Sequence, residues 1–128
     1  MTAENAHISP ATMAAPGGHY SHAVKACGLI FISGQLPIKS DGTKLIEASF
    51  EEQALQVLDN VAQALLAAGS TIDRLVQVRV YVTSIGSWPA FNTIYAKWAG
   101  ASRPARAVVP VPSLHYGFQI EVEAIAVQ

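Results

Sequence analysis

The sequence predicts an α+β fold, in which two helices pack on one face of a mixed β-sheet. The first observation is a helix pattern at residues 49–69, with an N-terminal capping signal and one apolar face. The second is a stretch at residues 75–83 that alternates between apolar and polar side chains, as strands with one buried face do. The third is the order of the segments, β-β-α-β-α-β-β, which places each helix in a connection between strands.

The N-terminal third is predicted to form a hairpin between two irregular segments. Residues 1–18 contain acid and proline and lack the basic-then-apolar order of a signal peptide, so we expect a loose lead-in. Short strands are expected at Ala23–Val24 and Leu29–Ser33, joined by a turn at Cys27–Gly28. Residues 34–43, which include an Asp-Gly pair, are expected to form a loop.

Residues 49–69 carry the clearest local signal of the chain. Ser49 at the N-cap and Glu52 three residues later form a capping box, which satisfies backbone amides of the first turn. Gly69 supplies the left-handed residue that commonly ends a helix. Apolar residues at three- and four-residue spacing define the face that should be buried: Phe50, Ala54, Leu58, Val61 and Leu65.

The second half of the chain is predicted to contain a strand, a helix and two further strands. The strand at residues 75–83 should bury its valines, which are Val76, Val78, Val80 and Val82. A helix is expected at Ser87–Ala99, followed by strands at Ala105–Val111 and Gln119–Val127. With both helices on one face, the opposite face needs a partner, and bulky polar residues such as Arg79 and Tyr81 suit a subunit interface.

Length and composition limit the classes of protein to consider. A chain of 128 residues fits a single domain, residues 1–128, and an apolar content of 51% suggests that some surface is hidden in an oligomer. The net charge of −1 argues against nucleic-acid and anionic-lipid partners, and no apolar run reaches the roughly 20 residues of a membrane span. The single cysteine gives no sign of an oxidising compartment, so we expect a cytoplasmic protein.

Metal and covalent chemistry find little support in the sequence. The four histidines show no helix-spaced pair, and His19 and His22 lie in an expected loop, where a histidine is usually solvated. Cys27 has only Lys25 as a basic neighbour, and no nucleophile elbow or phosphate-binding glycine loop is present. We therefore expect neither a metal nor an organic cofactor.

Arg106, Glu121 and Glu123 are the remaining candidates for chemistry. The two glutamates are two residues apart and so share one face of a strand. Arg106 begins the preceding strand, and we expect the two strands to be adjacent and antiparallel, which would bring these groups close. The spacing alone favours a cross-strand or intersubunit salt bridge. The alternative is that the guanidinium binds a substrate carboxylate through two parallel hydrogen bonds.

Several segments together resemble the Rid family, the YjgF-like reactive intermediate imine/enamine deaminases. They are PGGHYSHAV, LIFISGQLP, LDNVAQALLAAG, VYVTSI, FNTIYAKW, RPARAVV and IEVEAIAV, and they span nearly the whole chain. The resemblance implies a chorismate-mutase-like fold and a homotrimer with clefts between subunits. It also implies hydrolysis of 2-imino acids, such as 2-iminopropanoate or 2-iminobutanoate, and of their enamine tautomers, to 2-oxo acids and ammonia, without a cofactor.

The resemblance assigns roles to individual residues. Arg106 matches the arginine that binds the substrate carboxylate, and Glu121 matches the residue that activates the attacking water. The positions expected to line the cleft are Tyr20, Ser33, Gln35 and Asn92. Val108 stands where many relatives have a cysteine, so only a main-chain contact would be kept there. His19 and the segment LHYGF at 114–118 also depart from the family pattern, beside the expected pocket.

Three other functions stay open at this stage. One is a trimer that binds a small carboxylate without chemistry, against which the presence of Glu121 argues mildly. Another is a specialised deaminase in a degradation pathway, acting on an aminoacrylate- or aminomuconate-like enamine. A ribonuclease activity, known for some relatives, fits poorly with the net charge of −1 and with the lack of a basic patch.

Overall fold

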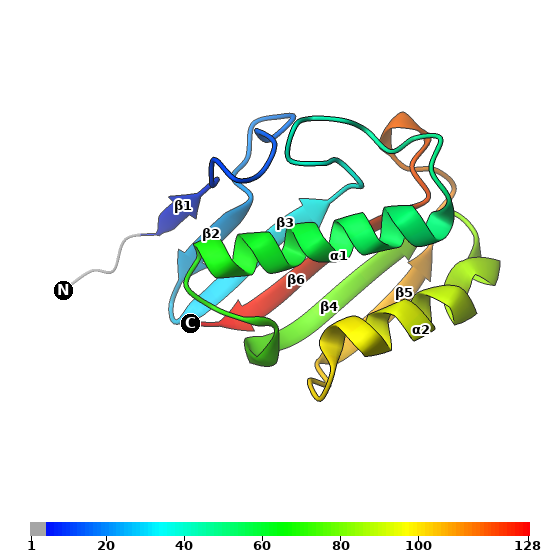
Figure 1. Cartoon of the computed structure of the whole chain (residues 1–128). Helices are drawn as coiled ribbons and strands as arrows, with labels where there is room; N and C mark the ends of the chain where they lie inside the picture. The colour runs from blue at the N-terminus through cyan, green and yellow to red at the C-terminus, as the bar shows by residue number, and fades with distance from the viewer. Residues whose placement is uncertain (1–4) are drawn as a thin grey trace.

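The computed structural model describes residues 5–128 and confirms an α+β fold with a mixed six-stranded sheet (Figure 1). The strands are β1 (Ala6–Ile8), β2 (Ala23–Ala26), β3 (Leu29–Gln35), β4 (Leu75–Val82), β5 (Ala105–Pro110) and β6 (Ile120–Val127). The helices are α1 (Phe50–Ala67) and α2 (Trp88–Ala99), and the short 3-10 turns are η1 (Ile72–Arg74), η2 (Ile85–Ser87) and η3 (His115–Gly117). Both helices lie on the same face of the sheet. None of the helices in residues 5–128 is long and apolar enough to cross a membrane.

The strand order is β1-β2-β3-β6-β4-β5, so β6 lies in the interior of the sheet, between β3 and β4. The β4–β5 pair is parallel, with α2 in the connection between the two strands, and the other pairs are antiparallel. This order contradicts the expectation that β5 and β6 are adjacent. A strand that follows β4 through a helix returns parallel to it at the edge, and β6 then fills the position on the other side of β4.

The core lies between the helices and the sheet. The Ser49 hydroxyl accepts a hydrogen bond from the Glu52 backbone N–H at 3.2 Å, which confirms the predicted cap of α1. The apolar face of α1 is fully buried against inward-facing side chains of the central strands, among them Val80 and Val122. Burial of each such side chain contributes about 1.5–3 kcal/mol to folding, so this face fixes the helix on the sheet.

The predictions for two segments were wrong, because both contain strand residues where loops were expected. Residues 6–8, inside the predicted lead-in, form the edge strand β1, which pairs with β2; residues 1–4 of that segment lie outside the described part. Strand β3 continues through Gln35, into the predicted loop. In both places the chain gains ladder hydrogen bonds from a partner strand, which a local pattern does not reveal.

Val76 is the exception to the predicted burial of the β4 valines. It is 46% exposed, whereas Leu75 takes a buried position. Leu75 pairs with Ala126 of β6, but Gln77 pairs with the adjacent residue Ile125, so Val76 is the extra residue of a bulge. The bulge shifts the alternation by one position, and the regular pattern begins again at Val78.

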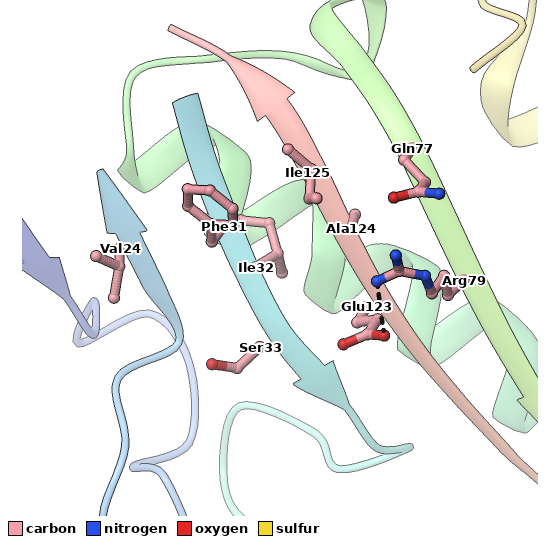
Figure 2. A pocket seen from close by; sticks show the side chains of 9 residues that line it. All are labelled: Val24, Phe31, Ile32, Ser33, Gln77, Arg79, Glu123, Ala124 and Ile125. Atoms are coloured by element: carbon pink, nitrogen blue, oxygen red, sulfur yellow. Dashed lines mark hydrogen bonds and ion pairs between the residues drawn. The ribbon is translucent and has the colours of Figure 1, made fainter. Parts of the chain in front are cut away.

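The sheet face opposite the helices is uncovered in the single chain, and we call it the open face. A hollow of about 180 Å³ lies on it, and Figure 2 shows the residues of β2, β3, β6 and β4 that line this hollow. Phe31 and Val127 lie on this face with exposed fractions of 42% and 39%, and Ile125 lies beside Phe31 in the register. Polar residues from β4 and β6, such as Arg79 and Glu123, share this face with the apolar side chains. The open face is thus mixed, in contrast to the apolar core.

Candidate active site

Glu121 lies in a hollow of about 510 Å³ on the open face, and we call this the Glu121 hollow. Its walls come from three segments that are far apart in sequence: the loop before β2, the end of β3 with the residues after it, and the η3 turn with β6. The lining residues are Gly17, Gly18, Tyr20, Ser33, Gly34, Leu36, Ile38, His115, Tyr116, Glu121 and Glu123. The topology thus brings Tyr20 and Ser33 to Glu121, as the resemblance implied.

Gly34 permits the position of the Glu121 side chain. A Cβ atom built on Gly34 would lie 2.0 Å from the Glu121 Oε2 atom, so any other residue would displace the carboxylate. Burial raises the pKa of the Glu121 carboxyl; His115 opposes this increase and Glu123 adds to it. A half-buried carboxylate with a raised pKa is suited to accept a proton from water. Gly34 was not among the predicted site residues, although a glycine inside an apolar strand is a sign of close backbone approach.

Tyr20 and Ser33 make local contacts at the rim of the Glu121 hollow. The Tyr20 hydroxyl accepts a long hydrogen bond from the Gly17 N–H, at 3.4 Å, and the side chain is 48% exposed. The Ser33 hydroxyl donates to the Ser21 carbonyl at 2.6 Å. Ser33 therefore fixes the loop before β2, while the exposed ring of Tyr20 is accessible to a ligand.

Gln35 lies beneath the hollow and does not line it. Its side chain is 3% exposed and donates to His22 Nδ1 at 3.2 Å and to the Ser33 carbonyl at 3.1 Å. His22 Nε2 lies 2.7 Å from the Ala14 carbonyl, so Nε2 carries the proton and Nδ1 accepts from Gln35. The expectation that His22 is a solvated loop residue is wrong, because only 7% of it is exposed. The pair holds the loop that carries Tyr20.

Arg106 lies in a second hollow, of about 450 Å³, between β5 and α2. Arg106 is opposite the buried Val78 in the parallel register, and its side chain turns toward α2. Its Nη1 donates to Asn92 Oδ1 at 3.0 Å, and its guanidinium lies 4.9 Å from the centre of the Tyr95 ring. These contacts orient the guanidinium, and Asn92 acts here as its support. Burial raises the pKa of Tyr95, and its hydroxyl finds no hydrogen-bond partner in residues 5–128.

Val108 lies two residues after Arg106 on the same face of β5. It is opposite Val80 in the register and packs against the core. Its side chain is half-buried against the core, and it does not line the Glu121 hollow. A main-chain contact with a ligand at this position stays a prediction.

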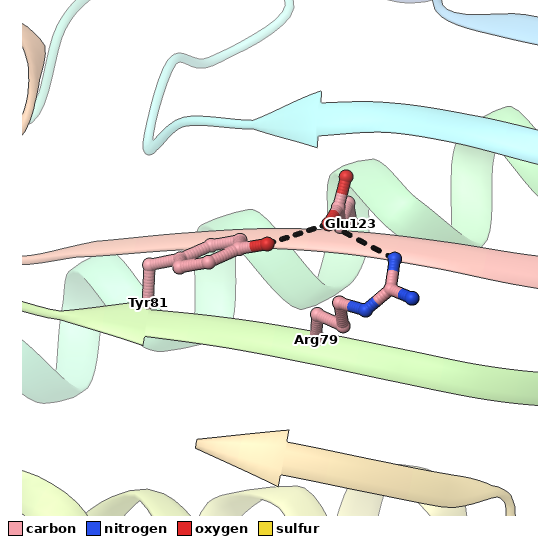
Figure 3. A network of polar contacts seen from close by, with 3 residues as sticks. All are labelled: Arg79, Tyr81 and Glu123. Carbon is pink, nitrogen blue, oxygen red and sulfur yellow. Dashed lines mark hydrogen bonds and ion pairs between the residues drawn. The ribbon is translucent and has the colours of Figure 1, made fainter. Parts of the chain in front are cut away.

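A single chain does not bring Arg106 and Glu121 together. Glu121 is opposite Tyr81 in the register and lies on the open face, whereas Arg106 is opposite Val78 on the helix-covered face. Glu123 binds other groups: its Oε1 accepts from Tyr81 at 2.6 Å and lies 3.5 Å from Arg79 Nη1 (Figure 3). An ion pair of Arg106 with either glutamate of the same chain is therefore wrong. A contact across a subunit interface stays a prediction.

Comparisons with known proteins agree on one family. The family described as Endoribonuclease L-PSP matches residues 11–128. Protein HMF1 of Saccharomyces cerevisiae is 41% identical over 114 residues, covering 89% of this chain and 88% of its own. A goat protein (Capra hircus) named 2-iminobutanoate/2-iminopropanoate deaminase is 38% identical over 121 residues, covering 94% and 88%. The crystal structure of RidA from an Antarctic Psychrobacter superposes with a TM-score of 0.90 at 30% identity, covering 96% and 99%.

Proposed function

The chain belongs to the Rid (YjgF-like) family, and from this premise we propose that it hydrolyses reactive 2-imino acids and their enamine tautomers to 2-oxo acids and ammonia. The observation that carries the proposal is the Glu121 carboxylate, which is half-buried above Gly34 and whose pKa is raised by burial. A goat relative named as an imine deaminase supports the same reaction. We expect this chemistry to need no cofactor, and the cytoplasm stays our prediction for its location.

The reaction requires a base and a means of orienting the substrate. Glu121 accepts a proton from water as the water oxygen forms a bond with C2 of the imine, and the imine nitrogen gains a proton. The hydroxyl group of the resulting carbinolamine then loses its proton, the amino nitrogen gains a proton, and the C–N bond breaks, which releases ammonia and leaves the 2-oxo acid. Arg106 binds the substrate carboxylate through two hydrogen bonds and so aims C2 at the water.

The proposed site forms only between subunits. Among residues 5–128, no arginine or lysine lines the Glu121 hollow, and Arg106 lies on the opposite face of the same sheet. A neighbouring chain that covers the open face could supply the missing guanidinium. We therefore propose a homotrimer, with a cleft at each contact where one chain contributes Arg106 and the next contributes Glu121. The exposed apolar side chains of the open face, such as Phe31, support this arrangement.

Mixed assemblies test the shared site. Arg106→Ala and Glu121→Gln chains should each form inactive assemblies, whereas refolding the two together should restore activity. In a random equimolar trimer, about a quarter of the clefts receive both intact residues. Ammonia release is measured with imines generated in situ by an amino-acid oxidase, and each variant refolded alone is the control. An inactive mixture, or light scattering that gives the 13.5 kDa mass of one chain, would contradict the proposal.

The same assay separates the other candidate functions. An enamine from a specialised pathway would be hydrolysed in strong preference to all simple imines, and a purely binding trimer would retain carboxylates without releasing ammonia. Incubation of the wild-type protein with single-stranded RNA tests the nuclease activity that the family description names. We expect ammonia release and intact RNA.

A further inference from the structure

Tyr116, at the centre of the η3 turn between β5 and β6, combines an unusual backbone with an exposed ring. Its φ and ψ angles are 60° and 11°, in the left-handed region that residues other than glycine, asparagine and aspartate rarely adopt. Its side chain is 54% exposed, so burial in the core does not explain the conformation. Gly117, which follows it, also has a positive φ of 78°, so the two residues form a tight turn like Cys27–Gly28, and this turn exposes the Tyr116 ring at the surface.

Two contacts hold the ring of Tyr116 at the rim of the Glu121 hollow. The ring makes an edge-to-face contact with Phe118, which is 1% exposed, with the ring centres 5.8 Å apart at an angle of 77°. On another side, Lys44 Nζ lies 5.0 Å from the ring centre, within the range of a cation–π contact. Lys44 is itself bridged to Ile38, which lines the same hollow. The ring is thus fixed between a buried anchor and a neighbouring loop.

The Glu121 hollow has a polar part and an apolar part. Glu121, Glu123, Ser33 and His115 supply the polar groups, while Leu36, Ile38 and the rings of Tyr20 and Tyr116 supply the apolar walls. A substrate whose C2 atom lies beside Glu121 must place its side chain somewhere in the remaining space. The apolar walls favour a side chain that is apolar and larger than a methyl group.

We propose that Tyr116 is a specificity-determining residue, whose ring contacts the side chain of the substrate and favours imino acids with long apolar or aromatic side chains. This inference rests on the proposed imine hydrolysis and specifies its substrate class. The ring is held in place before the substrate arrives, so the contact costs little ordering. A difference of a few methylene groups in an apolar contact alters kcat/KM by roughly tenfold or more, which is the effect expected here.

The test compares substrates of different size in matched variants. Imines are generated in situ from alanine, leucine and phenylalanine, and kcat/KM is measured for each. Tyr116→Asn removes the ring but keeps a residue that tolerates the left-handed backbone, and Tyr116→Phe keeps the ring. Cys27→Asn is the control. Among residues 5–128, Cys27 is the other non-glycine residue with a positive φ angle, and it lies in the turn between β2 and β3, outside the site. Melting temperatures confirm that each variant is folded.

The wild-type protein should prefer the imines from leucine and phenylalanine to the imine from alanine. In Tyr116→Asn the ratio of large-substrate to small-substrate kcat/KM should fall by roughly tenfold, while Tyr116→Phe and Cys27→Asn should keep the wild-type ratio. An unchanged ratio in folded Tyr116→Asn overturns this inference alone. A Tyr116→Phe variant that behaves like Tyr116→Asn also overturns it, because the hydroxyl would then be the important group. If the wild-type protein releases no ammonia from any of the imines, the proposed function is overturned as well.

Discussion

The two faces of the sheet are made by the same strands but carry different kinds of side chain. On the helix-covered face, the central positions of β4 and β6 are fully buried aliphatic residues, such as Val80 and Val122. On the open face, the alternate positions of the same strands are Tyr81, Glu121 and Glu123, beside exposed apolar groups of β3. The period of two along a strand therefore separates the residues that fold the domain from those that meet a ligand or another chain.

The two candidate catalytic residues differ in the same way. Glu121 belongs to the open face and lies over a glycine. Arg106 belongs to the covered face, where Asn92 and the Tyr95 ring orient it. We expect changes at Glu121 to affect chemistry with little loss of stability. Changes at Arg106 should affect carboxylate binding first, and the substitutions below separate this effect from a structural one.

Glu121→Gln should have the largest effect, a loss of roughly 10²–10⁴ in turnover, as expected when a general base is removed. The matched control is Glu123→Gln, on the same face of β6, which should reduce turnover much less because Glu123 already binds Tyr81 and Arg79. Turnover is measured as ammonia release from imines under saturating conditions. If Glu123→Gln were the more damaging change, Glu123 would be the base.

Arg106→Lys should be nearly as damaging as Arg106→Ala, with kcat/KM reduced by roughly tenfold to hundredfold, because a charged hydrogen bond contributes about 1.5–3 kcal/mol. Lysine keeps the charge but loses the planar pair of donors that orients a carboxylate. Kinetics and thermal melting are measured on both variants. A structural role predicts the opposite pattern, in which both variants melt early and lysine partly restores stability.

The raised pKa of Glu121 predicts a linked change in activity and stability with pH. Activity should rise with pH as the carboxylate ionises, through a pKa above the ordinary glutamate range. The folded state binds this proton more tightly than the unfolded chain does. The free energy of unfolding therefore does not depend on this group below its pKa in the unfolded chain, falls as the pH rises from that pKa to the raised pKa of the folded state, and stays lower above it. Glu121→Gln should therefore melt higher than the wild type near neutral pH and equally at acid pH. A lower melting temperature at neutral pH would contradict this.

Cys27→Asn should have the smallest effect and serves as a reference outside both faces. Cys27 and Gly28 have φ angles of 54° and 77°, which are those of the two-residue turn that Asn-Gly forms most readily. The substitution should stabilise the protein by up to about 1 kcal/mol, visible as a small rise in melting temperature. Activity should be unchanged, including after treatment with thiol reagents. Loss of activity on modification of the wild-type thiol would place Cys27 near the site.

Local sequence signals predicted the elements well but not how they meet. The Ser49 N-cap and the alternation after Val78 depend on residues that are near neighbours in sequence, and the structure confirms both. The bulge at Val76 and the insertion of β6 between β3 and β4 depend on a partner strand distant in sequence. No local pattern distinguishes these arrangements from a simple succession of hairpins.

The candidate site shows the same limit. The family resemblance named Glu121 and Arg106, but only the register shows that they lie on opposite faces. His22 is buried through bonds to Ala14 and Gln35, neither of which is near it in sequence. The segment at 114–118 departs from the family pattern, but its sequence does not reveal that Tyr116 has a left-handed backbone and lines the Glu121 hollow.

The position of β6 within the sheet also has a consequence for how the chain reaches this structure. Strands β1, β2 and β3 form one set and β4 with β5 another, and only β6 hydrogen-bonds to both. Because β6 follows all the other strands in sequence, strand pairing cannot join the two sets until β6 has left the ribosome. The central contacts then close between residues far apart in the chain, which is the slow class of folding step. Until that moment both inner edges, on β3 and on β4, are open to strands of other molecules, so the nascent chain is most prone to aggregation just before its last strand emerges.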